Sequence, residues 1–520
     1  MLGERRSISS NAAAGWAAAG GVAVRTSING GWVVGHANGD HRLIRDGVVV
    51  YEDNKIIFVG SRFDGTVDRE IDAGDKLVAP GFIDTHIHYG HRASHRLISD
   101  TGRPLFFGQP FLEVTIPRRG KKVTGDARWL AHGESTSEGA LDLNATYTVV
   151  ELIRGGVTTF AELGAQVMVQ DALLEQVKRF GARAYLSPGY DSGHWVGDEQ
   201  GRLERIHDEQ RGITGFKVAT EWIKQHDGSI SGRIRGILVP RRVWTTTIDL
   251  LKKTVALADE TGLPIATHAA FSIIEFHEIV AQYTMTPIEL LDSIGMLRPT
   301  LAIGHCNFIS DNPNMNYAVK NDLKLLGQAG TSISHCAINI ARRGRALDSW
   351  KNYVDAGVNI SLGSDTYPRD MIMNMRTASY MGKIASGSYF AATAGEVFTA
   401  ATLGGARSLG RDDLGKLAPG ALADIIIIDL SGRGTFRYGP VRDPIKSLIE
   451  CGVGDDVETV IIDGKTVMEN REIPGIDMSA LLKEAQASGE RVWASLPDWD
   501  PLERTAENAC PYCYPLIGGH

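Results

Sequence analysis

Two histidines stand two residues apart in the stretch PGFIDTHIHYG, which begins with an apolar run typical of a buried strand. Alternate side chains of a strand point to the same face, so His86 and His88 can both reach one cation. Three other short apolar runs also end in metal-type side chains, namely His268 in LPIATHAA, His305 in TLAIGHCNF and Asp365 in NISLGSDT. This pattern of ligand-type residues at four strand ends predicts a metal centre.

Imidazoles together with one carboxylate suit a divalent transition metal, most often Zn²⁺, with Fe²⁺ or Co²⁺ as alternatives. Three histidines and one aspartate leave a coordination position for water. A bound metal would lower the pKa of that water toward about 7 and make hydroxide available at neutral pH. The residues therefore predict a hydrolase that uses a metal-activated water.

The elements that must position these residues alternate along the middle of the chain. Apolar strand-like runs such as VTTFAEL are followed by segments with helical periodicity. TTTIDLLKKTVALADETG, for example, follows threonine caps and ends at a glycine, which predicts an amphipathic helix. Repetition of this unit over residues 79–407 predicts an α/β fold, a distorted (β/α)8 barrel with its chemistry at the carboxyl ends of the strands.

Both flanks of this middle part are rich in short strands. Residues 24–78 contain GVVVYEDNKIIFVG, and residues 408–473 contain ADIIIIDL and VETVIIDGKTVME, with turn signals between the apolar runs. We expect these two segments to form one small β-sandwich built from both chain ends. Residues 1–23 are predicted to be a flexible N-terminal tail, and residues 474–520 a C-terminal extension.

Composition excludes several classes of protein. The chain has 520 residues, of which 43% are hydrophobic and 22% charged, as in an ordinary globular protein. No apolar run reaches about 18 residues, so no membrane partner is expected. The formal net charge of −8 argues against a nucleic acid partner. Five cysteines are too few for a disulfide scaffold, which favours reduced thiols and a cytoplasmic protein.

Several stretches resemble the metal motifs of the amidohydrolase superfamily, namely LVAPGFIDTHIH, IATHAA, IGHCNFI, ISHCAINIA and SLGSDT. The later stretch AATLGGARSLGRDDLGKLAPGALADIIIIDL is similar to its triazine hydrolase and cytosine deaminase-like branch. The resemblance extends from about residue 24 to residue 473 and implies the barrel and small sandwich. It also implies a small-molecule substrate and a homo-oligomer, either a dimer or a tetramer.

The resemblance assigns roles residue by residue. His86 and His88 match the ligands on the first strand, and His268 matches the ligand on the fifth. Asp365 matches the ligand on the eighth strand, which in the family also accepts the proton of the attacking water. His305 matches the histidine on the sixth strand, which polarises the substrate or moves a proton. Asp365 and His305 are therefore the predicted catalytic residues.

One departure from the family pattern concerns proton transfer. The deaminase-like branch has a glutamate three residues after the fifth-strand histidine, and Phe271 occupies that position here. Glu275 can reach back one helical turn, although a solvated helix position is the favoured interpretation. The missing acid favours hydrolysis of an acyclic amide, urea or carbamate. A deaminase (aminohydrolase) or chlorohydrolase acting on a nitrogen heterocycle is the alternative, and a non-catalytic binding relative is the second alternative.

A second departure concerns the number of metals. Two-metal relatives often use a carboxylated lysine on the fourth strand, whereas Lys217 is predicted to lie on the preceding helix and to be solvated. This favours a single metal.

Further candidates for substrate contact come from position alone. They include two histidines after the first ligand pair, one on the seventh strand and the two residues discussed above, namely His91, His95, His335, Phe271 and Glu275. Trp195 and Trp244 are expected either to line the pocket or to belong to the core. The CPYC segment at Cys510–Cys513 is expected to pack on the body or on a neighbouring subunit.

Overall fold

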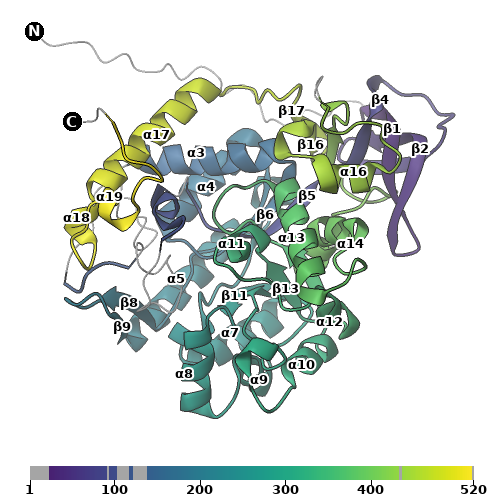
Figure 1. The fold of residues 1–520 in the computed structure, drawn as a ribbon. Coiled ribbons are helices and arrows are strands. Elements are labelled where there is room, and N and C mark those ends of the chain that lie inside the picture. The colour runs from purple at the N-terminus through teal and green to yellow at the C-terminus, as the bar shows by residue number, and fades with distance from the viewer. Residues whose placement is uncertain (1–22, 91–92, 102–115, 121–137, 433–435, 518–520) are drawn as a thin grey trace, which may run out of the picture.

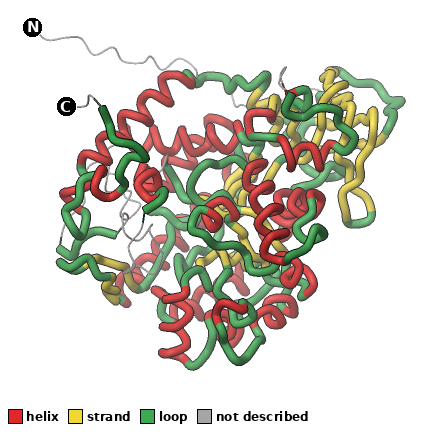
Figure 2. The backbone as a smooth tube through the Cα atoms, in the orientation of Figure 1, coloured by secondary structure: helices red, strands yellow, loops and turns green. Residues whose placement is uncertain are grey.

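The computed structural model describes residues 23–90, 93–101, 116–120, 138–432 and 436–517. Helices surround a group of central strands, and a separate sheet made of long strands projects at one side (Figure 1). Figure 2 shows the same division, with the central strands enclosed by helices and loops. None of the helices in the described ranges is long and apolar enough to cross a membrane.

Two four-stranded parallel sheets form the centre of the molecule. The first has the order β10-β7-β6-β5, with β5 (Phe82–Ile87), β6 (Val157–Glu162), β7 (Arg183–Leu186) and β10 (Ile234–Gly236). The second has the order β11-β12-β13-β14, with β11 (Ile265–Ala269), β12 (Leu301–His305), β13 (Ser332–His335) and β14 (Asn359–Leu362). Isolated parallel bridges join Ile87 to Asp365 and Leu238 to Ile265. The carboxyl ends of the paired strands therefore meet on one side.

Helices separate consecutive strands, as the sequence periodicity predicts. The helix predicted behind the threonine caps is α7 (Ile248–Thr261), and it ends at Gly262 with a φ of 72°. The other long helices are α3 (Glu138–Arg154), α4 (Val167–Phe180), α5 (Glu209–His226), α8 (Ile273–Tyr283) and α13 (Met371–Ser386). Shorter helices after β11 include α9 (Pro287–Ser293), α10 (Asp322–Gln328), α11 (Ala337–Ala341), α12 (Trp350–Asp355), α14 (Ala394–Thr399) and α16 (Pro444–Cys451).

The two chain ends share one seven-stranded mixed sheet. Its order is β17-β16-β15-β4-β1-β2-β3, with β1 (Arg25–Ala37), β2 (Asp40–Glu52), β3 (Lys55–Gly60), β4 (Arg69–Pro80), β15 (Ile425–Ile428), β16 (Val457–Ile462) and β17 (Lys465–Met468). We expected a sandwich, but β15 pairs antiparallel with the last residues of β4, from Leu77 to Pro80. The C-terminal strands therefore extend the N-terminal sheet by hydrogen bonding.

The C-terminal extension forms helices that pack on the body. They are α17 (Met478–Ala494), α18 (Leu496–Trp499) and α19 (Ala506–Ala509), and they contact α3 and the short helix η1 (Ala93–Ile98). Leu496 and Trp499 are almost completely buried. The Cys510 thiol lies 3.5 Å from the carbonyl oxygen of Ser99, whereas Cys513 is exposed. Residues 478–510 of this segment are thus a packed part of the protein, whereas residues 511–517 are exposed.

A buried ion pair joins the end sheet to the central strands. Arg183 of β7 donates to both carboxylate oxygens of Asp424, at 3.1 and 3.2 Å, and both side chains are almost fully buried. The Asp424 carboxylate also accepts a hydrogen bond from the backbone N–H of Asp463 at 2.8 Å. Two buried charges satisfied in this way depend on each other, because neither has water as a substitute partner.

The Asp424→Asn substitution should lower the free energy of unfolding by about 1.5–3 kcal/mol, because it removes the buried bidentate carboxylate partner of Arg183 and leaves only Asp463, at 3.5 Å, as an anion for this charge. Chemical denaturation followed by circular dichroism measures this loss. The matched control is Asp259→Asn, which removes an ion pair of Arg298 whose aspartate is exposed. It should cost less than about 1 kcal/mol. Equal losses in the two variants would contradict the assignment of Asp424 as a buried structural anion.

Candidate metal and substrate site

The strand ends bring the five predicted metal and catalytic residues together. His86 lies in β5 and His88 directly follows it, while His268 lies in β11 and His305 ends β12. The Oδ1 atom of Asp365 lies 3.5 Å from Nε2 of His88, and its Oδ2 atom lies 3.7 Å from Nε2 of His305. All except the partly exposed His88 are buried. The structure thus brings together the five residues that the sequence predicted to meet.

The hydrogen bonds of His268 fix which of its nitrogens faces the cluster. Its Nδ1 lies 2.6 Å from the carbonyl oxygen of Arg241, which can only accept, so Nδ1 carries the proton. Nε2 is then a lone pair, and it lies 3.3 Å from Nε2 of His88. Two nitrogens that bind one tetrahedral zinc at about 2.0–2.1 Å would lie about 3.3 Å apart. The spacing therefore fits a shared divalent ion.

Burial keeps the other imidazoles neutral, which is the state that binds metals. Burial lowers the pKa of His86 to about 3, and it lowers the pKa values of His268 and His305 well below their usual range. The Nε2 atom of His86 is buried and makes no hydrogen bond within the described part of the chain. Such an unsatisfied lone pair is costly in a protein interior unless a ligand satisfies it. The donor set thus fits a transition metal and not a purely structural polar core.

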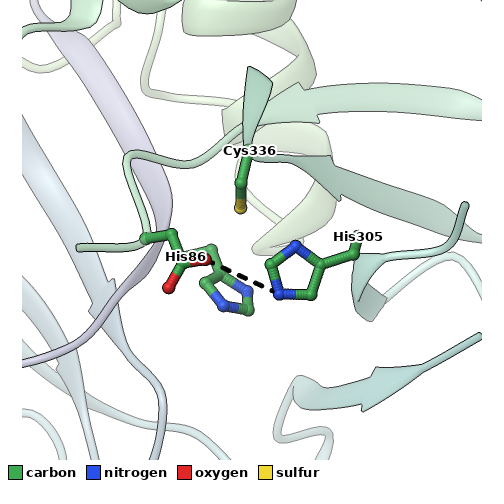
Figure 3. Close-up of side chains that lie close together, drawn as sticks. His86, His305 and Cys336 are labelled. Atoms are coloured by element: carbon green, nitrogen blue, oxygen red, sulfur yellow. Dashed lines mark ion pairs between the residues drawn. The ribbon is translucent and has the colours of Figure 1, made fainter. Parts of the chain in front are cut away.

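A second group of ligand-type atoms overlaps the first. It consists of His86, His305, Cys336 and Asp365, and Figure 3 shows the side chains of His86, His305 and Cys336 pointing toward one another. Burial raises the pKa of the Cys336 thiol well above its usual value, and the thiol lies 3.6 Å from the carbonyl oxygen of Ser334. A neutral thiol is a poor metal ligand. Cys336 therefore suits a divalent metal less well than the histidines and Asp365 do.

The backbone at the site is strained. His305 has a φ of +72° and Asp365 a φ of +61°, in the left-handed region that non-glycine residues rarely adopt. Each such residue costs on the order of 1–3 kcal/mol and persists where the surrounding structure enforces it. The backbone N–H of Asp365 donates to the carbonyl oxygen of His86 at 2.8 Å, which holds the two strand ends together. Strain at both predicted catalytic residues is typical of a functional site.

An aromatic wall lies beside the histidines. The ring of Phe271 is 6.3 Å from the rings of His268 and His305, and 6.5 Å from the rings of Trp195 and Trp244. The two tryptophan rings are 4.9 Å apart. We refer to Trp195, Trp244 and Phe271 as the aromatic wall. The three rings are tilted against one another by 44–59°, and each offers an apolar face on which a planar substrate group can stack.

Arg242 packs on the aromatic wall, and sequence reasoning missed it. Its guanidinium carbon lies 4.8 Å from the centre of the Trp195 ring, within cation–π range. Burial lowers the pKa of Arg242 to about 10, so the group remains charged at neutral pH. Its Nε atom is buried without a hydrogen-bond partner. The neighbouring motif VPRRVW offered only a general signal, namely two basic residues at the end of a strand.

Glu275 corrects an expectation from the sequence. It is fully buried and not solvated, because the chain turns sharply after β11 and places the first turn of α8 inside the molecule. One carboxyl oxygen accepts a hydrogen bond from the backbone N–H of Phe271 at 2.9 Å, and the other has no partner. Burial raises the pKa of Glu275 to about 8. A carboxylic acid that is largely protonated at neutral pH therefore lies against the backbone of Phe271.

The remaining candidates have mixed outcomes. His335 ends β13 and is buried, with its ring 6.2 Å from that of Trp350. His91 lies outside the described residues, and so does the side chain of His95, whose backbone belongs to η1. Lys217 is exposed on α5, away from any strand, as predicted.

Sequence reasoning also missed the residues that hold Asp365. Asn339 donates a short hydrogen bond to Oδ2 of Asp365, and Arg343 donates to Oδ1 of Asn339 at 3.0 Å. Both lie after His335 in the stretch SHCAINIARRGR, where nothing in the spacing distinguishes them from ordinary helix residues. Their partner is remote in sequence, so their role requires the three-dimensional arrangement.

The chain belongs to the amidohydrolase family. The model of the Amidohydrolase family matches residues 77–467, which is most of the chain. The proteins of this family to which the chain is similar are named as hydrolases or deaminases, and the enzyme class predicted from the motifs, a hydrolase acting on carbon–nitrogen bonds, is confirmed.

Characterised relatives are similar over nearly their whole length. The 5'-deoxyadenosine deaminase of Methanothermobacter thermautotrophicus is 29% identical over 455 residues, covering 86% of this chain and 94% of that protein. The 5-methylthioadenosine/S-adenosylhomocysteine deaminase of Thermococcus onnurineus is 30% identical over 448 residues, covering 83% of this chain and 95% of that protein.

Solved structures share the fold. An adenosine deaminase from Xanthomonas campestris, with bound zinc, has a TM-score of 0.73 and 22% identity, covering 90% of this chain and 98% of that one. The atrazine chlorohydrolase of Arthrobacter aurescens, complexed with zinc, has a TM-score of 0.73 and 22% identity, covering 89% of this chain and all of that one.

The His88→Asn substitution should lower metal affinity by at least about tenfold, because even residues that only orient metal ligands change affinity 10–100-fold. Plasma mass spectrometry of purified, dialysed protein measures the metal content. Cys336→Ala should keep the metal, because the thiol is neutral, and the exposed His277 on α8 provides the control His277→Asn. Loss of metal in Cys336→Ala with retention in His88→Asn would assign the ion to the other group of ligands.

The Glu275→Gln substitution should remove a pH dependence of stability. The folded state holds the Glu275 proton up to about pH 8, whereas the unfolded chain releases it near its usual value of 4.5. The protonated Glu275 therefore makes its full contribution to the free energy of unfolding below about pH 4.5, and this contribution is lost as the pH rises to 8. The free energy of unfolding of the wild type, relative to that of the variant, should therefore fall by on the order of several kcal/mol between pH 5 and pH 8. Parallel stability curves would show that Glu275 ionises normally.

Proposed function

We propose that the protein is a metal-dependent aminohydrolase that removes an exocyclic amino group from a nitrogen heterocycle, such as the purine base of a 5'-modified adenosine. The observation that carries this proposal is the aromatic wall beside the histidine–aspartate cluster, since a planar ring can lie on Phe271 while its amino-bearing carbon faces the cluster. The printed names of the relatives support the same chemistry. The acyclic amide, urea or carbamate substrate favoured by the sequence alone has less support.

The metal would be held by His86, His88, His268 and Asp365, and zinc is the ion that fits best. When bound, it supplies an acidified water with a pKa near 7. Asp365 accepts a proton from the attacking water, and its place beside His88 and His305 suits that role. His305 stabilises the charge that develops as the ring carbon becomes tetrahedral. The proton taken by Asp365 then goes to the amino group, which leaves as ammonia.

Glu275 is the proposed proton donor to the ring. The family position for this acid is occupied by Phe271, which cannot donate a proton. Glu275 hydrogen-bonds to the backbone of that same residue and remains protonated at neutral pH because of its burial. A pKa near the working pH is what general acid catalysis requires. The acid is thus supplied from the following helical turn.

We also infer that the eight parallel strands close into one distorted (β/α)8 barrel. The bridges between Ile87 and Asp365 and between Leu238 and Ile265 support this closure, because they link the two sheets at both edges. The predicted domain limits, a barrel over residues 79–407 with end segments 24–78 and 408–473, are consistent with this arrangement. A homo-oligomer and a cytoplasmic location stay predictions.

Release of ammonia from 5'-deoxyadenosine and 5-methylthioadenosine by the zinc-loaded protein tests the proposal. We expect stoichiometric ammonia and the corresponding inosine product, identified by mass spectrometry. Asp365→Asn should lower kcat by about 10²–10⁴-fold, the usual contribution of a general acid or base. His277→Asn should leave kcat unchanged. Hydrolysis of acyclic amides or ureas with no ammonia from any amino heterocycle would overturn the proposal.

The role of Glu275 has its own test in a rescue experiment. Glu275→Gln should lower kcat by about 10²-fold or more, because the proton donor is lost. Adding Phe271→Glu to this variant restores an acid at the family position and should recover part of the loss. If Glu275→Gln keeps full activity, another group protonates the ring.

A further inference from the structure

The C-terminal helices contact two segments that adjoin the site, one at the end of β8 and one after β5. These helices lie beyond the end of the family match at residue 467. Helices α17, α18 and α19 occupy residues 478–509, coloured yellow in Figure 1, and we refer to residues 478–510 as the C-terminal clamp. The clamp has two arms of contact. One reaches the strand that carries Trp195, and the other reaches the segment after β5.

The first arm ends on the strand β8 (Gly193–Gly197). The backbone N–H of Arg118 donates to the carbonyl oxygen of Trp499 at 3.0 Å, and Arg118 forms an ion pair with Glu503. Gly197 forms hydrogen bonds with both neighbours of Arg118. Its backbone N–H donates to the carbonyl oxygen of Pro117 at 2.9 Å, and its carbonyl oxygen accepts from the backbone N–H of Arg119 at 2.8 Å. The clamp therefore connects through Arg118 to the end of β8.

A direct contact strengthens this arm. The ring of Pro501 packs so closely on Gly197 that a Cβ atom there would lie 2.5 Å from the proline Cγ. The turn that presents Pro501 is rigid, because Arg504 forms bonds of 2.7 and 3.0 Å to the two carboxylate oxygens of the buried Asp500. A bidentate pair in a buried position fixes geometry as well as charge.

Two residues before Gly197 lies Trp195, which belongs to the aromatic wall. Its ring contacts Trp244, and the Arg242 guanidinium lies over it. The Nε1 atom of Trp195 is buried and has no hydrogen-bond partner among the residues that the structure describes. A buried indole N–H normally finds an acceptor, so this one is positioned for an acceptor atom of a bound molecule.

The second arm ends on η1 and reaches Tyr367. Trp493 donates from Nε1 to the carbonyl oxygen of Ala93 at 2.9 Å, and the Cys510 thiol lies 3.5 Å from the carbonyl oxygen of Ser99. Arg96 of η1 lies with its guanidinium carbon 4.1 Å from the centre of the Tyr367 ring. Tyr367 follows Asp365 by two residues. The first arm thus ends at Gly197, two residues from Trp195, and the second ends at Tyr367, two residues from Asp365.

We propose that the C-terminal clamp positions the aromatic wall, and that the buried side chain of Trp499 is the positioning residue that anchors the clamp segment carrying the carbonyl bonded to Arg118 and the ring of Pro501. We also propose that Trp195 Nε1–H donates a hydrogen bond to an acceptor on the substrate. The last part rests on the proposed function, because it assumes a heterocycle with ring nitrogens or a sugar oxygen. The clamp makes no described contact with a metal ligand. It therefore governs substrate binding and leaves the metal and the chemical step intact.

Kinetics and hydrogen exchange of the zinc-loaded full-length protein test this proposal. Trp499→Ala should raise KM about tenfold for the amino heterocycle with kcat within about twofold, as expected when binding is lost and chemistry is kept. Amide hydrogens of residues 193–197 should exchange at least about fivefold faster, because the clamp segment that contacts Arg118 and Gly197 loses its buried anchor. Trp499→Phe should restore both values, and metal content should stay at the wild-type level.

The matched control is Trp222→Ala, which removes another buried tryptophan, on α5. It should not raise KM or alter exchange in β8. If Trp499→Ala does not fold, Glu503→Gln removes the ion pair with Arg118 from an exposed position and should change the same two quantities to a smaller extent. Unchanged β8 exchange in these variants, or an equal rise of KM in Trp222→Ala, overturns the clamp. Should no amino heterocycle be turned over, the exchange measurement decides alone.

Discussion

Desolvation of the histidines is the constraint on which the rest of the site depends. Four imidazoles and one carboxylate meet where parallel strands end, and burial holds His86, His268 and His305 in the neutral state. Neutral imidazoles in a dry environment are strong ligands and poor bases. The fold therefore creates an affinity for a cation simply by excluding water. The same exclusion keeps Glu275 protonated, so one physical cause prepares both a metal site and an acid.

The metal-type residues at the strand ends could be predicted because each of them lies next to the apolar run that forms its strand. His86 and His88 follow an apolar run, and His268, His305 and Asp365 each close another, so a short window of sequence shows both the strand and its functional end. Their convergence follows from the parallel arrangement of consecutive strands, which the alternation of strands and helices predicts. The order of the central strands and the position of the cluster were therefore within reach of sequence reasoning.

Other features depended on contacts between distant segments. Burial of Glu275 is decided by the sharp turn after β11, and helical periodicity alone made this residue look solvated. The roles of Asn339 and Arg242 come from neighbours 26 or more residues away. The predicted sandwich became one sheet because the edge of β4 is free to pair with β15, a choice between stacking and edge pairing that strand propensity does not distinguish.

The pairing of β4 with β15 also has a consequence during synthesis. The edge of β4 at Leu77–Pro80 emerges from the ribosome roughly 350 residues before its partner Ile425–Ile428. At about 5–20 residues per second, this edge stays unpaired for on the order of 20–70 seconds. An open apolar edge of this kind is a template for pairing with another chain. The nascent protein thus passes through a period in which a chaperone or rapid folding of the intervening strands must protect its N-terminal strands from aggregation.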